Sequence, residues 1–452
     1  MKTYDALVLG GGTAGTAAAK ALHAAGAKVA MFNDGELGGL CILRGCMPTK
    51  TLLHAAHFLH EARHTKTPGV SASGVEFDFA AIMANKDAKV ARFKRAKIGG
   101  IESAGYEVID ARARFAGEDT VEAGGETYRF TKGAVIATGS VPSLPPIPGI
   151  EGVKVLTSDD ALELSEAPDS MLVLGSGAIG LELAQFYARL GTQVHLVSRR
   201  RVGLKIDPDV ADEMEAFLRD EPNFHLHQPC TPTAIEQDAR GVRMTLDGER
   251  TIEASCFLAA TGRRAAVDDL NLAAVGVQVE RGAIAHGPDM RSSNPRIFVT
   301  GDATGERQLL HVANWEGAVA AGNLLDPEAG LEVEQRLHME VIFTDPPLST
   351  LGLTEAAARE AGHDPVVSLI RFPETGRAIT MDVSHGISKL VADRRTGELL
   401  GAQLLGPRAD DLIHILSVHM YHRGTAAQLL EMPWYHPTLA EVLLSQAREL
   451  GT

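Results

Sequence analysis

The sequence predicts an α/β fold in which one strand–loop–helix–strand unit occurs twice and a region of mixed strands and helices follows. Three observations support this. A glycine-rich loop follows an apolar run at residues 10–15, a second such loop occupies residues 175–180, and a proline-rich segment at residues 142–148 separates the two. A chain of 452 residues should divide into about two to four domains, because single hydrophobic cores stop growing near about 250–300 residues.

The first unit begins with an apolar run over residues 4–9, and we expect a helix to about residue 25 and a second strand by about residue 32. Its loop has glycines at the three positions that such a turn needs. Gly10 permits the tight turn, Gly12 lets backbone amides approach a pyrophosphate, and Gly15 lets the helix pack closely on the strand. The N-terminus of the helix attracts negative charge. The unit therefore predicts a dinucleotide site.

The second unit repeats this pattern, with an apolar run at residues 171–174 and a strand expected at residues 194–197. Gly175, Gly177 and Gly180 stand at the equivalent positions of its loop. One such glycine pattern is weak evidence, but two copies between the expected strand and helix predict two dinucleotides.

Composition narrows the function classes. The formal net charge of -15 argues against binding to nucleic acid or to an anionic membrane. No apolar stretch reaches the roughly 18 residues of a membrane span, and the N-terminus lacks the pattern of a secretory signal. We therefore expect a cytoplasmic location, and we expect no metal site.

Two of the four cysteines lie close together, as Cys41 and Cys46, before Pro48 and Lys50. Residues five apart in a regular helix are more than about 7 Å apart at Cα, which is too far for a disulfide. A bridge would therefore require Cys41 to lie on a distorted turn before a helix that we expect over residues 51–62. The residues alone leave two interpretations open, a redox pair or two buried thiols near a turn. Cys230 and Cys256 stand apart, and we expect both to be buried.

The chain resembles the pyridine nucleotide–disulfide oxidoreductases, the family of dihydrolipoamide dehydrogenase, glutathione reductase and mercuric reductase. The resemblance spans nearly the whole sequence. It rests on the C-x4-C segment with Pro48-Thr49-Lys50, the second glycine loop, Ala137-Thr138-Gly139-Ser140, Thr300-Gly301-Asp302 and the ending His436-Pro437-Thr438-Leu439-Ala440-Glu441.

The resemblance implies an FAD-binding domain in two parts, 1–148 and 269–334, an NAD(P)-binding domain at 149–268, and a C-terminal α+β dimerisation domain at 335–452. It implies that the first loop and Asp302 hold FAD and that the second loop holds the nicotinamide nucleotide. The complete set of implied cofactor residues is Gly10, Gly12, Gly15, Asn33, Lys50, Thr138, Gly139, Asp302, Gly175, Gly177, Gly180, Arg199, Arg200 and Gly262.

The resemblance also assigns catalytic roles. Cys46 would lie against the flavin, and Cys41, the more exposed thiol, would exchange with a small disulfide or dithiol substrate. Lys50 would lie near the flavin with Glu182 as its carboxylate partner. His436 and Glu441 would form an acid–base pair that reaches the active site from the second subunit of a homodimer.

The end of the strand in the second unit indicates the nucleotide. NAD enzymes place an acidic residue there, whereas this sequence has Ser198, Arg199, Arg200 and Arg201. Guanidinium groups suit a 2′-phosphate, so we expect NADPH. Gly180 is a feature of NAD-using members and favours NADH, the less favoured alternative.

Two departures from the family pattern stand out. Asn33 occupies the strand end that usually presents a glutamate to the FAD ribose, and we expect FAD binding to be retained with altered geometry. Trp434 and Tyr435 precede His436 where smaller residues are usual, and they could narrow the thiol channel or pack a dimer interface.

The substrate stays open between lipoamide-like and glutathione-like disulfides. Mercuric reductase would add a cysteine pair near the C-terminus, and residues 444–452 contain none, so mercury reduction is disfavoured. A transhydrogenase or oxidase without a dithiol, and a non-catalytic subunit of a larger complex, are the rival classes. The presence of Cys41, Cys46, His436 and Glu441 argues against both.

Overall fold

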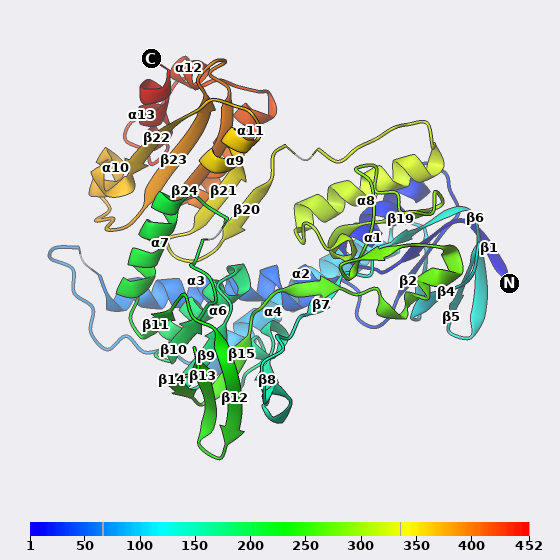
Figure 1. Cartoon of the computed structure of the whole chain (residues 1–452), viewed down its shortest axis with the longest axis horizontal. Helices are drawn as coiled ribbons and strands as arrows, with labels where there is room; N and C mark the ends of the chain where they lie inside the picture. Colours follow the sequence, from blue (N-terminus) through cyan, green and yellow to red (C-terminus); the bar gives the residue numbers. More distant parts are fainter. Residues whose placement is uncertain (66, 204, 335, 452) are drawn as a thin grey trace. The chain divides into compact units, whose positions relative to one another are not determined.

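The computed structural model describes residues 1–65, 67–203, 205–334 and 336–451 (Figure 1). The chain forms two compact units. Unit 1 consists of Met1–Pro48, Ala84–Ser143 and Gly262–Glu334, and unit 2 consists of Thr49–Met83, Leu144–Thr261 and Gln335–Thr452. One passage between the units, after Ser143, falls inside the proline-rich segment. The passages after Pro48 and Met83 were not expected from the sequence, and the predicted domain boundaries stay a prediction.

Unit 1 is built on a sheet whose strands follow the order β3-β2-β1-β6-β5-β4, with β19 paired to β6. The pairs β1–β2, β2–β3, β1–β6 and β6–β19 are parallel, so the carboxyl ends of β1, β2 and β6 lie in register at Leu9, Phe32 and Ile136. The strands of this unit are β1 (Lys2–Leu9), β2 (Val29–Asn33), β3 (Glu107–Asp110), β4 (Ala113–Gly117), β5 (Thr120–Ala123), β6 (Glu126–Ile136), β7 (Ser140–Pro142), β16 (Arg263–Ala265), β17 (Val279–Glu280), β18 (Ala283–Ile284) and β19 (Ile297–Val299).

Helices α1 (Thr13–Ala24) and α8 (Leu310–Leu325) lie alongside each other in this unit (Figure 1). They bury apolar residues against the sheet, among them Ala18, Leu22 and Val319 with Val8 and Val135. The opposite face carries a second core that includes Leu7, Phe32 and Phe130. The first strand–loop–helix–strand unit is confirmed, with β2 ending one residue later than expected.

The cysteine segment forms two helices, α2 (Leu40–Arg44) and α3 (Cys46–Arg63), which are followed by α4 (Phe79–Glu102). The helix expected over residues 51–62 therefore begins earlier, at Cys46. Pro48 is tolerated within the first turn, because its missing N–H would have no helical partner there.

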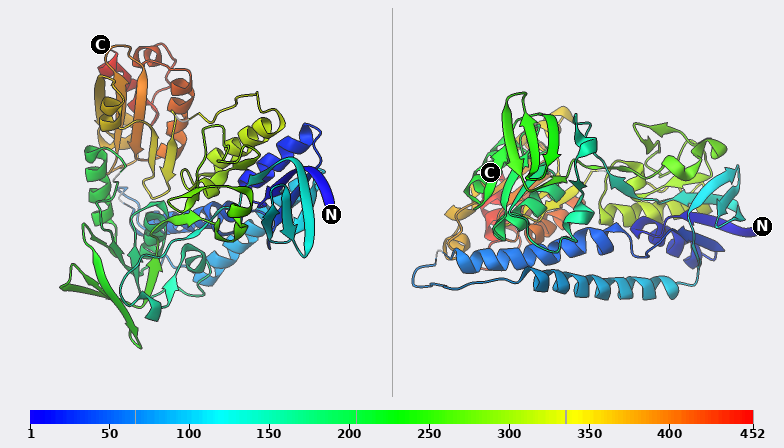
Figure 2. Two further views of the ribbon diagram at one scale, coloured as in Figure 1. Left: turned by 45° about the vertical axis from the view of Figure 1, so that its right-hand side comes forward. Right: turned by 90° about the horizontal axis from the view of Figure 1, so that it is seen from below.

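Unit 2 contains a parallel sheet of order β11-β10-β9-β15-β8, which confirms the second strand–loop–helix–strand unit. An antiparallel sheet of β12, β13 and β14 projects beside it (Figure 2). The elements are β8 (Val155–Leu156), α5 (Ser158–Ala161), β9 (Ser170–Leu174), α6 (Ala178–Arg189), β10 (Gln193–Val197), α7 (Pro208–Asp220), β11 (Phe224–His227), β12 (Pro232–Asp238), β13 (Gly241–Leu246), β14 (Arg250–Ala254) and β15 (Cys256–Ala259).

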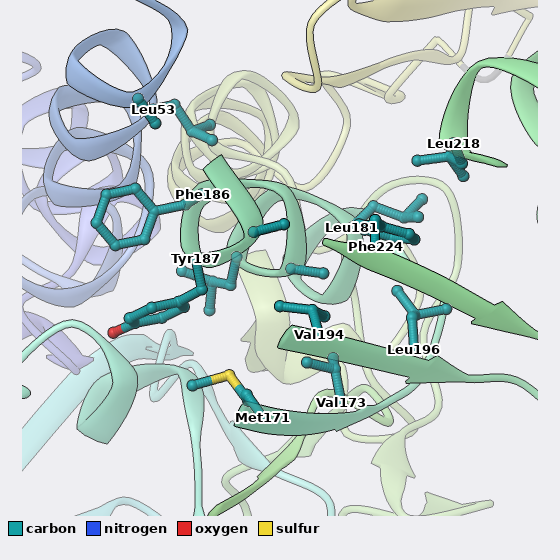
Figure 3. Packing of buried hydrophobic residues seen from close by; sticks show 14 of the residues in the cluster. Leu53, Met171, Val173, Leu181, Phe186, Tyr187, Val194, Leu196, Leu218 and Phe224 are labelled. Carbon is teal, nitrogen blue, oxygen red and sulfur yellow. The ribbon is translucent and has the colours of Figure 1, made fainter. Parts of the chain in front are cut away.

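The core of unit 2 fixes the position of α6 on this sheet. Figure 3 shows Tyr187 of α6 on the side of Met171 and Phe186 pointing toward Leu53 of α3, and all four side chains are buried. Burying an aromatic or large aliphatic side chain contributes about 1.5–3 kcal/mol. The same helix carries Glu182, one turn before Phe186.

The C-terminal region of unit 2 is an antiparallel sheet of order β20-β21-β24-β23-β22 with helices packed on it, which confirms the expected α+β region. Its elements are β20 (Met339–Ile342), β21 (Leu348–Gly352), α9 (Glu355–Glu360), β22 (Pro365–Arg371), α10 (Gly376–Ile379), β23 (Ile387–Asp393), β24 (Leu399–Leu405), α11 (Ala409–Tyr421), α12 (Ala426–Leu430) and α13 (Glu441–Leu450). Among the helices of the described residues, none is both long and apolar enough to cross a membrane.

Candidate active site

The first glycine loop leaves no room for side chains at two of its predicted positions. Gly10 has φ +114°, in the region that favours glycine, and a β-carbon there would overlap the carbonyl oxygen of Ala137. A β-carbon on Gly15 would overlap the carbonyl oxygen of Gly10. At Gly12 the nearest atom is the Cα of Gly39, at 4.0 Å from such a β-carbon. The backbone is therefore packed tightly under the loop and is open above Gly12, as a pyrophosphate site requires.

Asn33, at the end of β2, is part of this loop. Its Oδ1 accepts a hydrogen bond from the backbone N–H of Gly11 at 3.2 Å, and its Nδ2 donates to the carbonyl of Gly35 at 2.8 Å. The amide therefore ties the glycine loop to the segment that leads to Cys41. A glutamate could not supply the second of these bonds, because an ionised carboxylate only accepts.

Two buried hydroxyls of unit 1, that of the predicted cofactor residue Thr138 and that of Thr300, lack a protein partner among the described residues. Gly139, beside Thr138, has φ +76° and open space where a side chain would stand. Buried hydroxyls of this kind are costly unless a ligand or water satisfies them. The glycine cradle and these hydroxyls fit FAD, which carries both phosphate and hydroxyl groups.

Asp302 is held by a short hydrogen-bond relay. Ser140 Oγ donates to Asp302 Oδ2 at 2.5 Å, and Arg263 Nε donates to Ser140 Oγ at 2.8 Å. Gly262, which precedes Arg263, has φ +106° and open space around its Cα. The relay leaves the second carboxylate oxygen of Asp302 for a ligand hydroxyl.

A buried carboxyl lies beneath the Asp302 turn. Glu316 of α8 is 4% exposed and accepts a hydrogen bond from the N–H of Gly301 at 2.6 Å. Burial, with a smaller contribution from the nearby charges of Glu306 and Asp302, raises the pKa of Glu316 to about 7. This carboxyl exchanges a proton near neutral pH.

The second glycine loop repeats the geometry of the first. Gly175 has φ +115°, and a β-carbon there would overlap the carbonyl oxygen of Ala260. A β-carbon on Gly180 would overlap the carbonyl oxygen of Gly175, whereas the space around Gly177 is open. The loop thus satisfies the same physical requirements for a bound pyrophosphate.

The end of β10 carries hydroxyl and guanidinium groups. Ser198 is buried, and its Oγ lies 2.8 Å from Ser176 Oγ in the glycine loop. Arg199 and Arg200 are exposed. Arg201, by contrast, pairs with Asp212 and Glu215 of α7. Two of the three consecutive arginines are therefore open to an anion, and the third is engaged within the fold.

The two cysteines flank a helix break at Gly45. A β-carbon on Gly45 would lie 3.0 Å from the carbonyl oxygen of Leu40 and 3.2 Å from Cys41 Cα, so the chain is tightly packed where α2 ends. This is the distorted turn before the helix that a bridge requires. At the other end of α2, a β-carbon on Gly39 would lie 3.0 Å from Gly12 Cα. The segment therefore lies against the first glycine loop.

The expected order of thiol exposure is wrong for the single chain. Cys46 is exposed and Cys41 is half-buried, although Cys41 was expected to be the more exposed. Cys41 lies within the short helix α2, and Cys46 is the first residue of α3.

Lys50 and Glu182 form the predicted ion pair. Lys50 Nζ lies 2.8 Å from Glu182 Oε2 and 4.4 Å from the ring centroid of Phe343. Glu182 Oε1 accepts a hydrogen bond from the N–H of Phe343 at 3.0 Å. Glu182 is buried and Lys50 is 32% exposed. One carboxylate oxygen thus holds the ammonium group, and the other fixes the carboxylate on the backbone at Phe343.

His436 and Glu441 are also brought together. His436 Nδ1 lies 3.0 and 3.2 Å from the two carboxylate oxygens of Glu441, and Glu441 Oε2 accepts a hydrogen bond from Thr438 N–H at 2.9 Å. The Thr438 amide and then His436 lower the pKa of Glu441. The His436 side chain is 77% exposed, as a group that serves a second molecule would be.

The two aromatic residues before His436 differ in their surroundings. Trp434 is half-buried in the C-terminal core and donates from Nε1 to the carbonyl of Leu429 at 2.8 Å. Tyr435 is 83% exposed. Trp434 therefore packs its own subunit, and only Tyr435 is available to a channel or an interface.

The remaining cysteines are poorly reactive. Cys230 is buried, as expected, and burial raises its pKa. Cys256 is half-buried, contrary to the expected full burial, because its strand β15 packs only partly covered beside Ser170. Burial raises its pKa to about 11. Neither thiol supplies thiolate near neutral pH.

Sequence reasoning missed several residues around these sites, namely the polar residues Ser140, Ser176, Ser198, Arg263 and Thr300, and Phe343, which contributes its backbone N–H and its ring. Ser140 and Thr300 stand inside motifs that were recognised, so their position next to Thr138 and Asp302 was a usable signal. The contribution of the Phe343 backbone N–H had no signal in the sequence, because any residue type except proline supplies such a group.

Comparison with known proteins agrees with this geometry. Residues 4–317 match the family model for the pyridine nucleotide-disulphide oxidoreductases, and residues 339–447 match the model of their dimerisation domain. A mercuric reductase of Streptomyces lividans is 35% identical over 97% of this chain and 94% of its own length. A dihydrolipoyl dehydrogenase of Bacillus subtilis (strain 168) is 32% identical over 98% of this chain and 95% of its own length.

A solved structure is similar over the whole chain. The HOCl-induced flavoprotein disulfide reductase RclA from Escherichia coli superposes with a TM-score of 0.88 at 27% identity, covering 98% of this chain and 99% of that one. The family implies FAD, a pyridine nucleotide, a disulfide substrate and a homodimer. The chain therefore belongs to the pyridine nucleotide-disulphide oxidoreductases and is an FAD-dependent disulfide oxidoreductase.

Proposed function

We propose that this enzyme takes electron pairs from NADPH and delivers them through a Cys41–Cys46 disulfide to a small disulfide of the lipoamide or glutathione type, in the cytoplasm. The observation that carries the proposal is the close approach of Gly39 to Gly12, which brings the cysteine segment onto the first glycine loop. FAD, when bound, accepts a hydride from the nicotinamide and passes the electron pair to the disulfide.

The helix break gives the two thiols different roles. Cys46 is the first residue of α3, an 18-residue helix, and the positive end of a helix dipole favours a thiolate there. Its exposed side faces the region that we assign to the flavin ring. Cys41, on the short helix α2, is the thiol that exchanges with substrate.

In the exchange step, the Cys41 thiolate attacks one sulfur of the substrate disulfide. The substrate S–S bond breaks, a mixed disulfide forms at Cys41, and the leaving thiolate takes up a proton. The Cys46 thiolate then attacks the Cys41 sulfur, which restores the Cys41–Cys46 bond and releases the second substrate thiolate. Two electrons pass from the dithiol to the substrate in each cycle.

His436 supplies the proton in this scheme. With Nδ1–H donated to Glu441, the Nε2 atom of the imidazole is the one that holds or releases a proton. The ionised Glu441 stabilises the protonated ring. We assign this pair to the active site of the partner subunit, which is supported by the 77% exposure of the His436 side chain and by the dimerisation domain at residues 339–447.

Lys50 acts as a fixed cation. Glu182 and Phe343 hold its ammonium group on the first turns of α3, and a positive charge there stabilises electron density that develops nearby during reduction.

The preference for NADPH rests on Arg199 and Arg200. Both are exposed at the end of β10, while Arg201 is engaged by α7. Their guanidinium groups suit a 2′-phosphate, and a ribose hydroxyl would have no acidic partner there.

Mercuric ion reduction is the second candidate, and the 35% identity to mercuric reductases favours it. Reduction of a mercuric ion needs thiolates to bind the metal. Cys41 and Cys46 could provide them, but Cys230 and Cys256 have raised pKa values and no suitable exposure to add a second pair.

An anaerobic substrate panel tests the proposal. The flavin-loaded enzyme is assayed with lipoamide, oxidised glutathione and mercuric ion, each with NADPH and with NADH. We expect turnover of a disulfide with NADPH, loss of that turnover in Cys41→Ser, and retention in the matched control Cys256→Ser. Turnover of mercuric ion alone would replace the proposed substrate, and full disulfide turnover by Cys41→Ser would overturn the assignment of the outer thiol.

A further inference from the structure

A lysine of α4 is anchored at the start of α1. Lys97 Nζ donates a hydrogen bond to Thr16 Oγ1 at 2.9 Å. Thr16 is 6% exposed, and its own hydroxyl donates to the carbonyls of Gly12 and Thr13 at 2.9 and 3.0 Å. The ammonium group is therefore held by a hydroxyl that is fixed on the helix backbone.

The same place receives the cysteine segment. Gly39, which precedes α2, packs on Gly12, one turn from Thr16. Lys94, one turn before Lys97 on α4, forms an ion pair with Glu36 in the loop that leads to α2. Helix α4 thus contacts both the glycine loop and the chain that carries Cys41.

The charges around Lys97 are unusual for a half-buried ammonium group. Burial lowers the pKa of Lys97, the neighbouring Lys20 of α1 lowers it further, and Cys41 raises it. Within the described chain, the charged groups that act on Lys97 are thus a second cation and the thiol of Cys41. A Cys41 thiolate would balance the charge of Lys97.

We propose that Lys97 is a positioning residue that holds a positive charge beside Cys41 and favours its thiolate in the reduced enzyme. This inference rests on the proposed function, because it concerns the thiol that attacks the substrate. An opposite charge nearby favours the ionised form of a titrating group, and the thiolate is the nucleophile in disulfide exchange.

Other titratable and charged groups around Cys41 enter the same equilibrium. They are Lys20 on α1, Arg44 on α2, Cys46 at the start of α3 and, in the proposed dimer, His436 of the partner subunit. Lys20 adds to the positive potential, whereas a Cys46 thiolate opposes it. The test must therefore change only the charge at Lys97 and must measure the reactivity of the Cys41 thiol separately from that of Cys46.

The alkylation rate of Cys41 provides that measurement. The full-length, flavin-loaded enzyme is reduced with NADPH, treated with iodoacetamide between about pH 6 and pH 9, and mapped by peptide mass spectrometry. The Cys41 sulfur forms a bond to the methylene carbon as iodide leaves, so the rate follows the thiolate fraction.

Lys97→Met should slow alkylation of Cys41 about threefold to tenfold at pH 7 and move the profile to higher pH, because a tenfold change corresponds to about one pKa unit. Lys97→Arg keeps the charge and should restore a rate near that of the wild type. Lys89→Met removes an exposed lysine two turns away on α4 and should leave the profile unchanged. Thr16→Val keeps the charge but removes its anchor, and should give a smaller shift.

Two failures can be told apart. A Lys97→Met profile that coincides with the wild type, in a protein with normal flavin content, would overturn the role of Lys97 only. If Lys97→Met does not fold, Lys97→Arg still tests the proposal. A Lys97→Arg alkylation profile that moves to higher pH by as much as the Thr16→Val profile would overturn the role of Lys97. If NADPH does not make wild-type Cys41 reactive at all, the proposed function itself fails.

Discussion

The two glycine loops have almost the same backbone but differ in what surrounds them. Gly10 and Gly175 have φ +114° and +115°, and in both loops the third glycine packs on the carbonyl of the first. At the strand ends, however, Asn33 bonds into the first loop, whereas the second loop has Ser198 followed by exposed arginines. We therefore assign pyrophosphate binding to the glycines and the choice of nucleotide to the strand end.

The buried carboxyls beside the two loops differ as well. Glu182 on α6 is paired with Lys50, whereas Glu316 on α8 accepts only the Gly301 N–H. Unit 1 therefore carries a carboxyl that titrates near neutral pH, and the carboxyl of unit 2 is fixed by a cation.

The largest expected effect comes from substituting the first glycine of each loop. Gly10→Ala and Gly175→Ala each place a side chain at positive φ against a carbonyl oxygen. We expect Gly10→Ala to be isolated without flavin, as measured by its visible absorbance. Gly175→Ala should keep its flavin and lose reduction by NADPH. Loss of flavin from both variants would contradict the assignment of one nucleotide to each loop.

Glu316→Gln should change the pH dependence of stability. Between about pH 4.5 and pH 7 the folded state holds a proton on Glu316 that the unfolded state has lost. The free energy of unfolding therefore falls as pH rises through this window, by up to about 3 kcal/mol. Glutamine can still accept the hydrogen bond from the Gly301 N–H but does not titrate. The free energy of unfolding of the variant should therefore not fall in this way as pH rises.

Urea unfolding of both proteins at pH 5 and pH 8 measures the effect. The control is Glu328→Gln, an exposed carboxyl in the segment after α8. If the free energy of unfolding falls equally between pH 5 and pH 8 in the wild type and in Glu316→Gln, Glu316 does not change its protonation state over this range.

Arg199→Glu should reverse the nucleotide preference. A carboxylate repels a 2′-phosphate and can accept from ribose hydroxyls, so the ratio of kcat/KM for NADPH to that for NADH should fall at least about tenfold. Arg240→Glu, an exposed position on the β12–β13 turn, is the charge-matched control. An unchanged ratio in Arg199→Glu would remove the second loop from nucleotide selection.

Asn33→Ala should have the smallest effect. It removes one hydrogen bond to Gly11 and one to Gly35, and a neutral bond contributes about 0.5–1.5 kcal/mol. We expect FAD to bind about threefold to tenfold more weakly, as measured by titration of the flavin-free protein. Wild-type affinity would mean that the loop keeps its shape without this amide.

The sequence was sufficient for elements whose geometry depends on the local chain. The two glycine loops and their flanking strands follow from short-range patterns, whereas the family resemblance supplied the pairing of His436 with Glu441. The Lys50–Glu182 pair is separated by 132 residues, and the family resemblance supplied it.

Features that depend on packing could not be predicted. The break between α2 and α3 at Gly45 and the greater exposure of Cys46 than of Cys41 had no signal in the sequence. The engagement of Arg201 by Asp212 and Glu215 requires the placement of α7. The anchoring of Lys97 by Thr16 joins residues 81 apart, and no motif marks it.

The most direct test of electron transfer to the cysteine pair is differential labelling of all four cysteines in the flavin-loaded protein, before and after anaerobic addition of NADPH. We predict that Cys41 and Cys46 resist alkylation before the nucleotide is added and become labelled after it, while Cys230 and Cys256 do not change. Labelling of Cys41 and Cys46 that is the same with and without NADPH would contradict a redox role for the pair.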